Sequence, residues 1–270
     1  MPELPEIASR AAQMKTELAG RTIRHVEVLQ PKCINLPEDE FASALSGATI
    51  LGVTCRGKWL FVETTKGWLL LNLGMGGEVL LVTRATLPEK RRLVLDFADG
   101  SSVSINFWWF GYAHFVPAGE LPTHAMTARL GPNALDVTLD QLRAKVKGQR
   151  KRVKAFLLDQ SEIAGIGNAY VHDILFLARL HPLQPLNTLT GAEVEALWKG
   201  IRDGLLPSID KGGAFYEVDL HGHKGGFDMQ HILVGYKEGQ LCPRCGAPIE
   251  KIKTGSTSSF ICPRCQALHD

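Results

Sequence analysis

The stretch that decides the C-terminal fold covers residues 242–265 and reads CPRCGAPIEKIKTGSTSSFICPRC. Each Cys-x-x-Cys pair places two thiolates on one side of a tight turn, and sixteen residues separate the two pairs. Two such turns at the ends of a hairpin complete a tetrahedral zinc site. Four thiolates leave no open position for a water, so we expect one structural zinc ion held by Cys242, Cys245, Cys262 and Cys265. Reduced cysteines without metal, or two redox pairs, are the alternative interpretation.

A basic segment lies upstream of this module. No acidic residue occurs between Gln141 and Leu158, and the segment contains Arg143, Lys145, Lys147, Arg150, Lys151, Arg152 and Lys154. It leads into residues 164–168, AGIGN, a glycine-rich turn at the expected start of a helix. Backbone amides at a helix N-terminus bind phosphate well. The combination predicts contact with a nucleic-acid backbone, and a solvated helix face is the alternative.

The surrounding region is expected to be helical from about residue 131 to about residue 211. Thr138-x-x-Gln141 and Thr190-x-x-Glu193 both have the form of a helix capping box. Two helical runs are expected between these boxes, at about 152–160 and 168–179.

The first 130 residues have a different character. Residues 6–19 have apolar side chains at helical spacing, and short β-branched or aromatic runs follow, separated by turn residues. Many short strands at close spacing indicate an antiparallel sandwich or barrel. The expected strands are Thr22–Leu29, Ile50–Thr54, Leu60–Thr64, Trp68–Leu73, Val79–Val82, Leu93–Phe97 and Val103–Phe107.

The composition fits a folded protein without a membrane anchor. Hydrophobic residues make up 45% of the 270 residues, and the net charge of +2 neither requires nor excludes a nucleic-acid partner. The most apolar stretch, Trp68–Val82, is broken by polar residues and glycines and is shorter than the roughly 20 apolar residues of a membrane span. The N-terminus is acidic, unlike a signal peptide. We therefore expect a cytoplasmic protein with reduced thiols.

The N-terminus carries a possible nucleophile. Met1 precedes the small residue Pro2 and is expected to be removed, which exposes a secondary amine beside Glu3. An α-amine has a reference pKa near ~8, so roughly a tenth of it is neutral at pH 7. A neutral amine can attack a sugar carbon and form an iminium, as a lysine does in Schiff-base catalysis. The alternative is a proline that only marks the start of the chain.

Taken in order, these features resemble the formamidopyrimidine-DNA glycosylase and endonuclease VIII family. The similarity spans nearly the whole chain and includes an N-terminal signature, a lysine turn, a wedge loop and the turn of a helix–two-turns–helix module. The matching segments are residues 2–6 (PELPE), 56–58 (RGK), 73–77 (LGMGG) and 165–170 (GIGNAY), together with the two Cys-x-x-Cys pairs.

The resemblance implies an α+β multidomain fold. An N-terminal antiparallel β-sandwich with flanking helices would form the catalytic domain at residues 1–130. A helix–two-turns–helix bundle would form a DNA-binding domain at 131–234, and a zinc-finger β-hairpin would occupy 235–270. Damaged or abasic duplex DNA would lie in the cleft between the domains, with one base flipped out of the helix.

The resemblance also implies an activity and a set of site residues. The protein would be a monomeric base-excision-repair glycosylase with AP lyase activity, located at the nucleoid of a bacterial-type cell. Pro2 would attack the sugar, Glu3 would transfer protons, and Lys58 would lie near a phosphate or the ring oxygen; β,δ-elimination would then nick the strand. The implied DNA-binding residues are Met75, Trp108, Trp109, Phe110, Lys154, Gly165, Gly167, Asn168 and Thr257.

Four positions depart from the family pattern. Trp108 and Trp109 stand where two arginines are usual, and a tryptophan can stack on a base but cannot make a bidentate hydrogen bond to it. Asn72 replaces a histidine beside the wedge loop. Thr257 replaces an arginine that grips phosphate, and a lost charge-assisted hydrogen bond is worth roughly 1.5–3 kcal/mol.

Two other classes of function stay open at this stage. A non-catalytic binder of damaged or unusual DNA with the same fold would explain the missing arginines, whereas the pairing of Pro2, Glu3 and Lys58 favours an enzyme. A zinc-ribbon protein of transcription or RNA metabolism would not explain the N-terminus. The glycine- and histidine-rich residues 219–227 correspond to a lesion-capping loop in the family, with an ordinary surface loop as the alternative.

Overall fold

The computed structural model describes residues 1–269 and divides them into two compact units. Unit 1 consists of Met1–Arg129 together with the returning segment Lys211–Gly226, and unit 2 consists of Leu130–Asp210 and residues 227–269. The two units are described separately.

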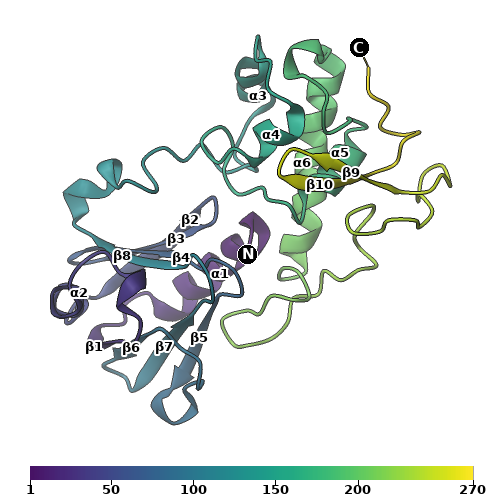
Figure 1. Ribbon diagram of the computed structural model, residues 1–270. Coiled ribbons are helices and arrows are strands. Elements are labelled where there is room, and N and C mark those ends of the chain that lie inside the picture. Colours follow the sequence, from purple (N-terminus) through teal and green to yellow (C-terminus); the bar gives the residue numbers. More distant parts are fainter. Residues whose placement is uncertain (270) are drawn as a thin grey trace. The chain divides into compact units, whose positions relative to one another are not determined.

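Unit 1 is a sandwich of two four-stranded antiparallel sheets, which Figure 1 shows as two layers. The strand orders are β1-β6-β7-β5 and β2-β3-β4-β8. The strands are β1 (Ile23–Val28), β2 (Ile50–Arg56), β3 (Trp59–Thr64), β4 (Gly67–Asn72), β5 (Glu78–Thr83), β6 (Leu93–Phe97), β7 (Ser101–Asn106) and β8 (Tyr112–Val116). The helices are α1 (Leu4–Leu18) and α2 (Glu38–Leu45), with 3-10 turns η1 (Pro31–Cys33), η2 (Arg84–Thr86) and η3 (Ala118–Thr123).

Apolar side chains from both sheets and both helices form one core in this unit. Helix α1 packs against β2 and β3, and α2 packs against β1 and β8. The seven predicted strands and the N-terminal helix are confirmed, within two residues at nearly every end. The sequence analysis missed α2 and β8. Helix α2 is short, with Phe41 and Leu45 its buried side chains, and the polar His114 interrupts the apolar run of β8.

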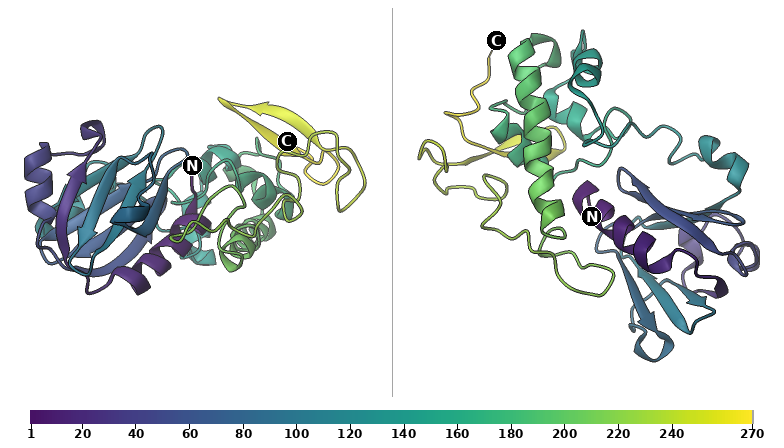
Figure 2. Two further views of the ribbon diagram at one scale, coloured as in Figure 1. Left: turned by 90° about the horizontal axis from the view of Figure 1, so that it is seen from below. Right: turned by 180° about the vertical axis from the view of Figure 1, so that it is seen from behind.

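Unit 2 is helical and carries the C-terminal hairpin. Its helices are α3 (Leu139–Val146), α4 (Val153–Leu158), α5 (Val171–Leu177) and α6 (Gly191–Asp210), with a 3-10 turn η4 (Leu186–Thr188) and the hairpin strands β9 (Glu250–Thr254) and β10 (Thr257–Ile261). Figure 2 shows α6 running along this unit in its right-hand view and the hairpin at its edge in its left-hand view. Thr138 caps α3 through Gln141 and Thr190 caps α6 through Glu193, so both predicted capping boxes are confirmed.

Two glycines of α6 allow it to lie close against α5. A Cβ atom added at Gly200 would come within 2.8 Å of the carbonyl oxygen of Ile174, and one added at Gly204 would come within 2.7 Å of the Ile174 side chain. Both distances are shorter than a van der Waals contact, so larger residues would push the helices apart. None of the helices formed by residues 1–269 combines the length and apolar character that a membrane crossing requires.

Candidate active site and nucleic-acid interface

The N-terminal motif is buried at the start of α1. Pro2 and Glu3 are both buried, and Glu3 occupies the N-cap position of the helix. The backbone N–H of Glu3 donates to Oε2 of Glu6 at 2.8 Å. Oε1 of the same carboxylate accepts the N–H of Ala214 at 3.1 Å, so Glu6 joins the returning segment to the helix start. Two acidic residues therefore lie at a helix N-terminus, where negative charge is favoured.

The lysine turn and the wedge loop are joined by one side chain. Lys58 is half-buried in the turn between β2 and β3, next to Gly57 with φ 59°. Nδ2 of Asn72 donates to the carbonyl oxygen of Lys58 at 3.2 Å. Oδ1 of Asn72 accepts the N–H of Gly74 at 3.0 Å. Asn72, which stands where the family usually has a histidine, therefore links the backbone of the lysine turn to the backbone of the wedge loop.

The wedge loop is paired with the aromatic segment that follows β7. Met75 is about half exposed, its N–H donates to the carbonyl oxygen of Trp109 at 3.0 Å, and its carbonyl oxygen accepts the N–H of Trp108 at 3.1 Å. Gly74 has φ 55°, and a Cβ there would lie 2.1 Å from the carbonyl oxygen of Trp109. The structure thus brings together residues that the resemblance implies to be DNA-binding and that lie more than thirty positions apart in the sequence.

Trp108, Trp109 and Phe110 form an exposed aromatic patch. Their exposed fractions are 63%, 65% and 70%, and Phe110 has φ 56°, which is uncommon for a bulky residue. Exposed aromatic clusters mark interaction surfaces, and stacking of a base on an aromatic ring is worth roughly 1–3 kcal/mol. The patch is chemically suited to unpaired or exposed bases.

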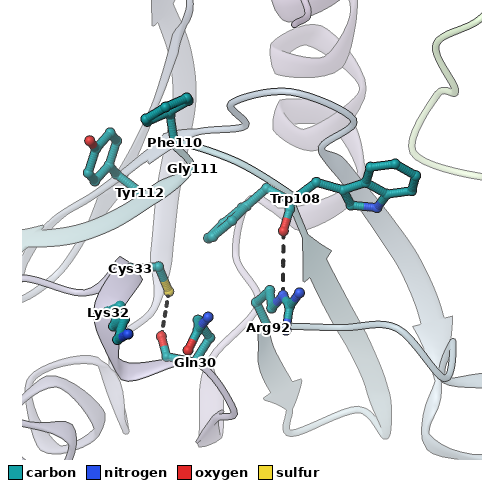
Figure 3. Close-up of a pocket in the computed structure, with 9 residues that line it drawn as sticks. Gln30, Lys32, Cys33, Arg92, Trp108, Phe110, Gly111 and Tyr112 are labelled. Carbon is teal, nitrogen blue, oxygen red and sulfur yellow. Dashed lines mark hydrogen bonds between the residues drawn. The ribbon is translucent and has the colours of Figure 1, made fainter.

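A pocket of about 190 Å³ lies beneath this patch (Figure 3). Sγ of Cys33 donates to the carbonyl oxygen of Gln30 at 2.9 Å, and Nε of Arg92 lies 3.4 Å from the carbonyl oxygen of Phe107. Figure 3 shows the Trp108 indole on the side away from this pocket. In both polar contacts the acceptor is a backbone oxygen. We therefore infer that the residues around the pocket support the backbone of the aromatic segment.

In unit 2, one glutamine closes the glycine-rich turn before α5. Oε1 of Gln160 accepts the N–H of Gly165 at 2.9 Å, and its Nε2 donates to the carbonyl oxygen of Ile166 at 2.8 Å. Gly165 has φ 107°, which favours glycine. Gly165 and Gly167 are buried, whereas Asn168 is half-buried and its Oδ1 has no hydrogen-bond partner among the described residues. The sequence analysis did not single out Gln160, because its role depends on this turn geometry.

The basic run is less uniform in the folded chain than in the sequence. Nζ of Lys151 contacts Asp159 at 2.9 Å and Glu162 at 3.3 Å, and Lys145 lies 3.8 Å from Glu162. These acids follow the run directly in the sequence and fold back on it. Lys145 and Lys151 are therefore paired with acids inside unit 2, whereas Arg150 is exposed.

Lys154 is buried, and its ammonium group is enclosed by the C-terminal hairpin. Its exposed fraction is 3%. Nζ lies within hydrogen-bond distance of four oxygens, which its three N–H groups share: Oγ1 of Thr254 (3.1 Å), Oγ1 of Thr257 (3.0 Å), the carbonyl oxygen of Ser258 (2.6 Å) and Oγ of Ser259 (2.9 Å). Burial lowers the pKa of Lys154 to about 8. The structure therefore brings together Lys154 and Thr257, two residues that the sequence analysis had assigned separately to phosphate.

The four cysteines of the hairpin converge as predicted. Their sulfur atoms all lie within 4.8 Å of one another, and the Sγ atoms are 3.9 Å apart for Cys242 and Cys265 and 3.4 Å apart for Cys245 and Cys262. A tetrahedral zinc with Zn–S bonds of roughly 2.3 Å needs sulfur atoms roughly 3.8 Å apart. The arrangement fits a closed structural zinc site, and none of the six cysteines forms a disulfide.

The fold and these sites define a two-unit protein with a β-sandwich, a helical module and a four-cysteine zinc hairpin. Three family models match the chain in this order. The formamidopyrimidine-DNA glycosylase N-terminal domain matches residues 1–106, the H2TH domain of the same proteins matches 130–218, and the zinc finger found in FPG and IleRS matches 239–268. The chain belongs to the formamidopyrimidine-DNA glycosylase family.

Relatives and solved structures agree with this assignment over the full length. The chain is 36% identical to a formamidopyrimidine-DNA glycosylase of Chloroflexus aurantiacus, covering 98% of both chains. It is 35% identical to the enzyme of Gluconobacter oxydans, covering 98% of this chain and all of the relative. A Lactococcus lactis FPG variant in complex with Fapy-dG containing DNA superposes with a TM-score of 0.90 at 30% identity, over 98% of this chain and 100% of the other. The Lactococcus lactis Fpg complex with DNA containing an abasic site gives 0.89 at 30% identity, over 98% and 99%.

Proposed function

We propose that this protein is a base-excision-repair DNA glycosylase with AP lyase activity, acting on damaged or abasic duplex DNA. The observation that carries the proposal is the burial of Pro2 and Glu3 at the start of α1, with a second carboxylate, Glu6, holding that start in place. A pure DNA-binding protein has no need of an amine and carboxylates in a buried cluster. Family membership and the likeness to protein–DNA complexes support the same reaction.

Three residues carry the chemistry in this proposal. Removal of Met1 exposes the amine of Pro2, which attacks the anomeric carbon and displaces the damaged base. Glu3 supplies and takes protons around the opened sugar, and Lys58 lies near a phosphate or the ring oxygen. The resulting iminium acidifies the sugar and allows β,δ-elimination to nick the strand.

The DNA contacts fall into two groups. Met75 and the aromatic segment 108–110 enter the space left by the flipped base and stack on neighbouring bases, which their pairing and exposure support. Gly165, Gly167, Asn168, Lys154 and Thr257 form the phosphate-facing group of unit 2. A pocket of about 280 Å³ beside the hairpin, lined by Arg152, Lys154 and Thr257 among others, supports this placement.

We assign the chain three functional regions, at residues 1–130, 131–234 and 235–270. The first carries Pro2, Glu3 and Lys58. The second carries the helix–two-turns–helix contacts with DNA and also contains the segment Lys211–Gly226, which folds as part of unit 1. The third carries the zinc finger. The zinc ion bound by Cys242, Cys245, Cys262 and Cys265 is structural, because four thiolates complete its coordination. We further propose that the protein acts as a monomer at the nucleoid of a bacterial-type cell; the relatives it matches are bacterial enzymes.

Borohydride trapping on a duplex with one abasic site tests the proposal. Borohydride reduces an iminium to a stable amine, so the wild-type chain should become covalently attached to the DNA. An abasic site needs no recognition of a damaged base, so the result does not depend on the unusual Trp108 and Trp109. Pro2→Gly keeps a terminal amine but makes it primary, and trapping should fall. A retained Met1, verified by intact mass, should abolish it.

A chain that binds this duplex but gives no adduct would favour the non-catalytic binder. The observation that favours a non-catalytic DNA-binding protein is the presence of Trp108 and Trp109 where the family usually has two arginines.

A further inference from the structure

The returning segment Lys211–Gly226 is held against the helix that carries the N-terminal motif. Besides the contact of Ala214 with Glu6, the Gln13 side chain donates to Oδ2 of Asp219 at 3.1 Å and accepts the N–H of Leu220 at 3.0 Å. The carbonyl oxygen of Leu220 accepts the N–H of Leu81 on β5 at 2.8 Å. This part of unit 1 is therefore fixed to both α1 and the sheet.

These anchors place a third carboxylate, Glu217, beside the start of the chain. Glu217 is 8% exposed, and its Oε1 lies 4.0 Å from the backbone nitrogen of Met1. Consecutive backbone nitrogens are roughly 3 to 3.7 Å apart, so the terminal ammonium stays in this neighbourhood when Met1 is removed and Pro2 becomes the terminus.

Charged groups of the chain start and of α1 act on Glu217. The terminal amine and Arg10 attract its negative charge, whereas Glu3 and Glu6 oppose it. Arg10 is itself buried, interacts also with Asp219 and Glu78, and has one guanidinium nitrogen without a hydrogen-bond partner among the described residues. Burial raises the pKa of Glu217 to about 7. A carboxylate with such a pKa can exchange a proton near neutral pH.

We infer that Glu217 is a further catalytic residue that takes the proton of the Pro2 ammonium before this nitrogen attacks the sugar. The inference rests on the proposed function and deepens it. The proton moves from the secondary ammonium to the carboxylate, which leaves a neutral amine with a free electron pair and a carboxylic acid. Glu3 is then free to serve the sugar and the leaving base, so the two carboxylates have separate tasks.

The test is the pH dependence of borohydride trapping under single-turnover conditions on an abasic-site duplex, from pH 5.5 to 9. In the wild-type chain, the rate should rise with pH as Glu217 loses its proton. Glu217→Gln keeps the size of the side chain but removes the base. Its rate should then follow the amine alone, with a midpoint moved upward toward the reference value near ~8 and a rate roughly tenfold lower on the acid side.

The direction in which the midpoint of the pH–rate profile moves distinguishes a proton-accepting Glu217 from a Glu217 that is only a counter-ion. If Glu217 were only a counter-ion, its removal would lower the pKa of the amine, and the midpoint would move to lower pH. A downward or absent shift would therefore overturn the inference. Asp219→Asn is the matched control, because it alters the hydrogen bonds of the same segment while keeping the Glu217 carboxylate, and its midpoint should stay with the wild type.

The wild-type adduct and one further variant keep the outcomes distinct. A wild-type chain that forms no adduct at any pH overturns the proposed function and this inference together, whereas a wild-type adduct with an unmoved Glu217→Gln midpoint overturns the inference alone. If Glu217→Gln does not fold, the midpoint measured for Glu217→Asp tests the inference instead. A slower reaction with the wild-type midpoint supports the inference, and a midpoint at lower pH overturns it.

Discussion

Replacement of Gly74 by alanine should separate the wedge loop from the aromatic segment. Gly74 has φ 55°, and its new Cβ would lie 2.1 Å from the carbonyl oxygen of Trp109 and 2.7 Å from the backbone nitrogen of Gly111. Backbone atoms on both strands of this contact must move. The movement breaks the two hydrogen bonds that join Met75 to Trp108 and Trp109.

The size of the effect follows from two contributions. A left-handed φ costs an alanine about 1–2 kcal/mol relative to glycine. The two lost backbone hydrogen bonds add about 1 kcal/mol each. Gly100→Ala supplies the matched control, because Gly100 also lies in unit 1 with φ 86°, but its Cβ meets no heavy atom of the described residues within 4 Å. The difference between the two variants, about 2 kcal/mol, measures the pairing and corresponds to a factor of roughly 30 in the population of the paired loop.

Two assays read out this difference. Urea denaturation should show a larger loss of unfolding free energy in Gly74→Ala than in Gly100→Ala, unless the loop opens locally and leaves the sheets intact. Excision of a damaged base that the wild-type chain removes from duplex DNA should fall by at least tenfold in Gly74→Ala, whereas trapping on an abasic site should fall much less, because no base has to be displaced. Equal stability of the two variants together with wild-type excision by Gly74→Ala would refute the reasoning.

Three further outcomes are expected. Cys242→Ser should lose the single bound zinc ion and DNA binding together, and metal analysis with a binding titration checks this; a metal-free mutant that binds DNA normally would contradict a structural zinc. Asn72→Ala should lose two hydrogen bonds of about 1 kcal/mol each and speed hydrogen exchange at the Gly74 amide, whereas Asn72→Asp keeps the acceptor for that amide and should preserve its protection. Since burial lowers the pKa of Lys154 from 10.5 to about 8, the unfolded chain binds the extra proton between these values, so stability attributable to this group rises with pH across that window and the rise should vanish in Lys154→Met.

Elements governed by local pattern could be predicted from the sequence. Short β-branched or aromatic runs between turn residues predicted the seven strands, and the capping boxes at Thr138 and Thr190 predicted two helix starts, because each signal lies within a few positions of the chain. The four-cysteine site could be predicted for the same reason, since its spacing alone defines the ligands. The family motifs located the turns around Lys58 and Met75.

Features that depend on distant contacts could not be predicted. The packing of segment 211–226 on α1 joins residues about two hundred positions apart, and no periodicity in either stretch indicates the other. Glu217 was therefore not singled out, although it lies beside the chain start. The pairing of Lys151 with Asp159 and Glu162 could not be predicted for a related reason, because these acids lie outside the basic run in the sequence and fold back on it.

The consequence of having Thr257 in place of the usual arginine also depends on a distant contact. From sequence alone, the substitution removes a positive charge from the tip of the zinc hairpin. In the folded chain, the Lys154 ammonium lies 3.0 Å from the Thr257 hydroxyl, a hundred residues away in the sequence. It is surrounded by neutral oxygens in the contacts described for the hairpin, so its charge is not cancelled there by a carboxylate. Lys154 therefore keeps one cation beside this position of the hairpin, so the loss of the arginine weakens the positive field that attracts a phosphate but does not remove it.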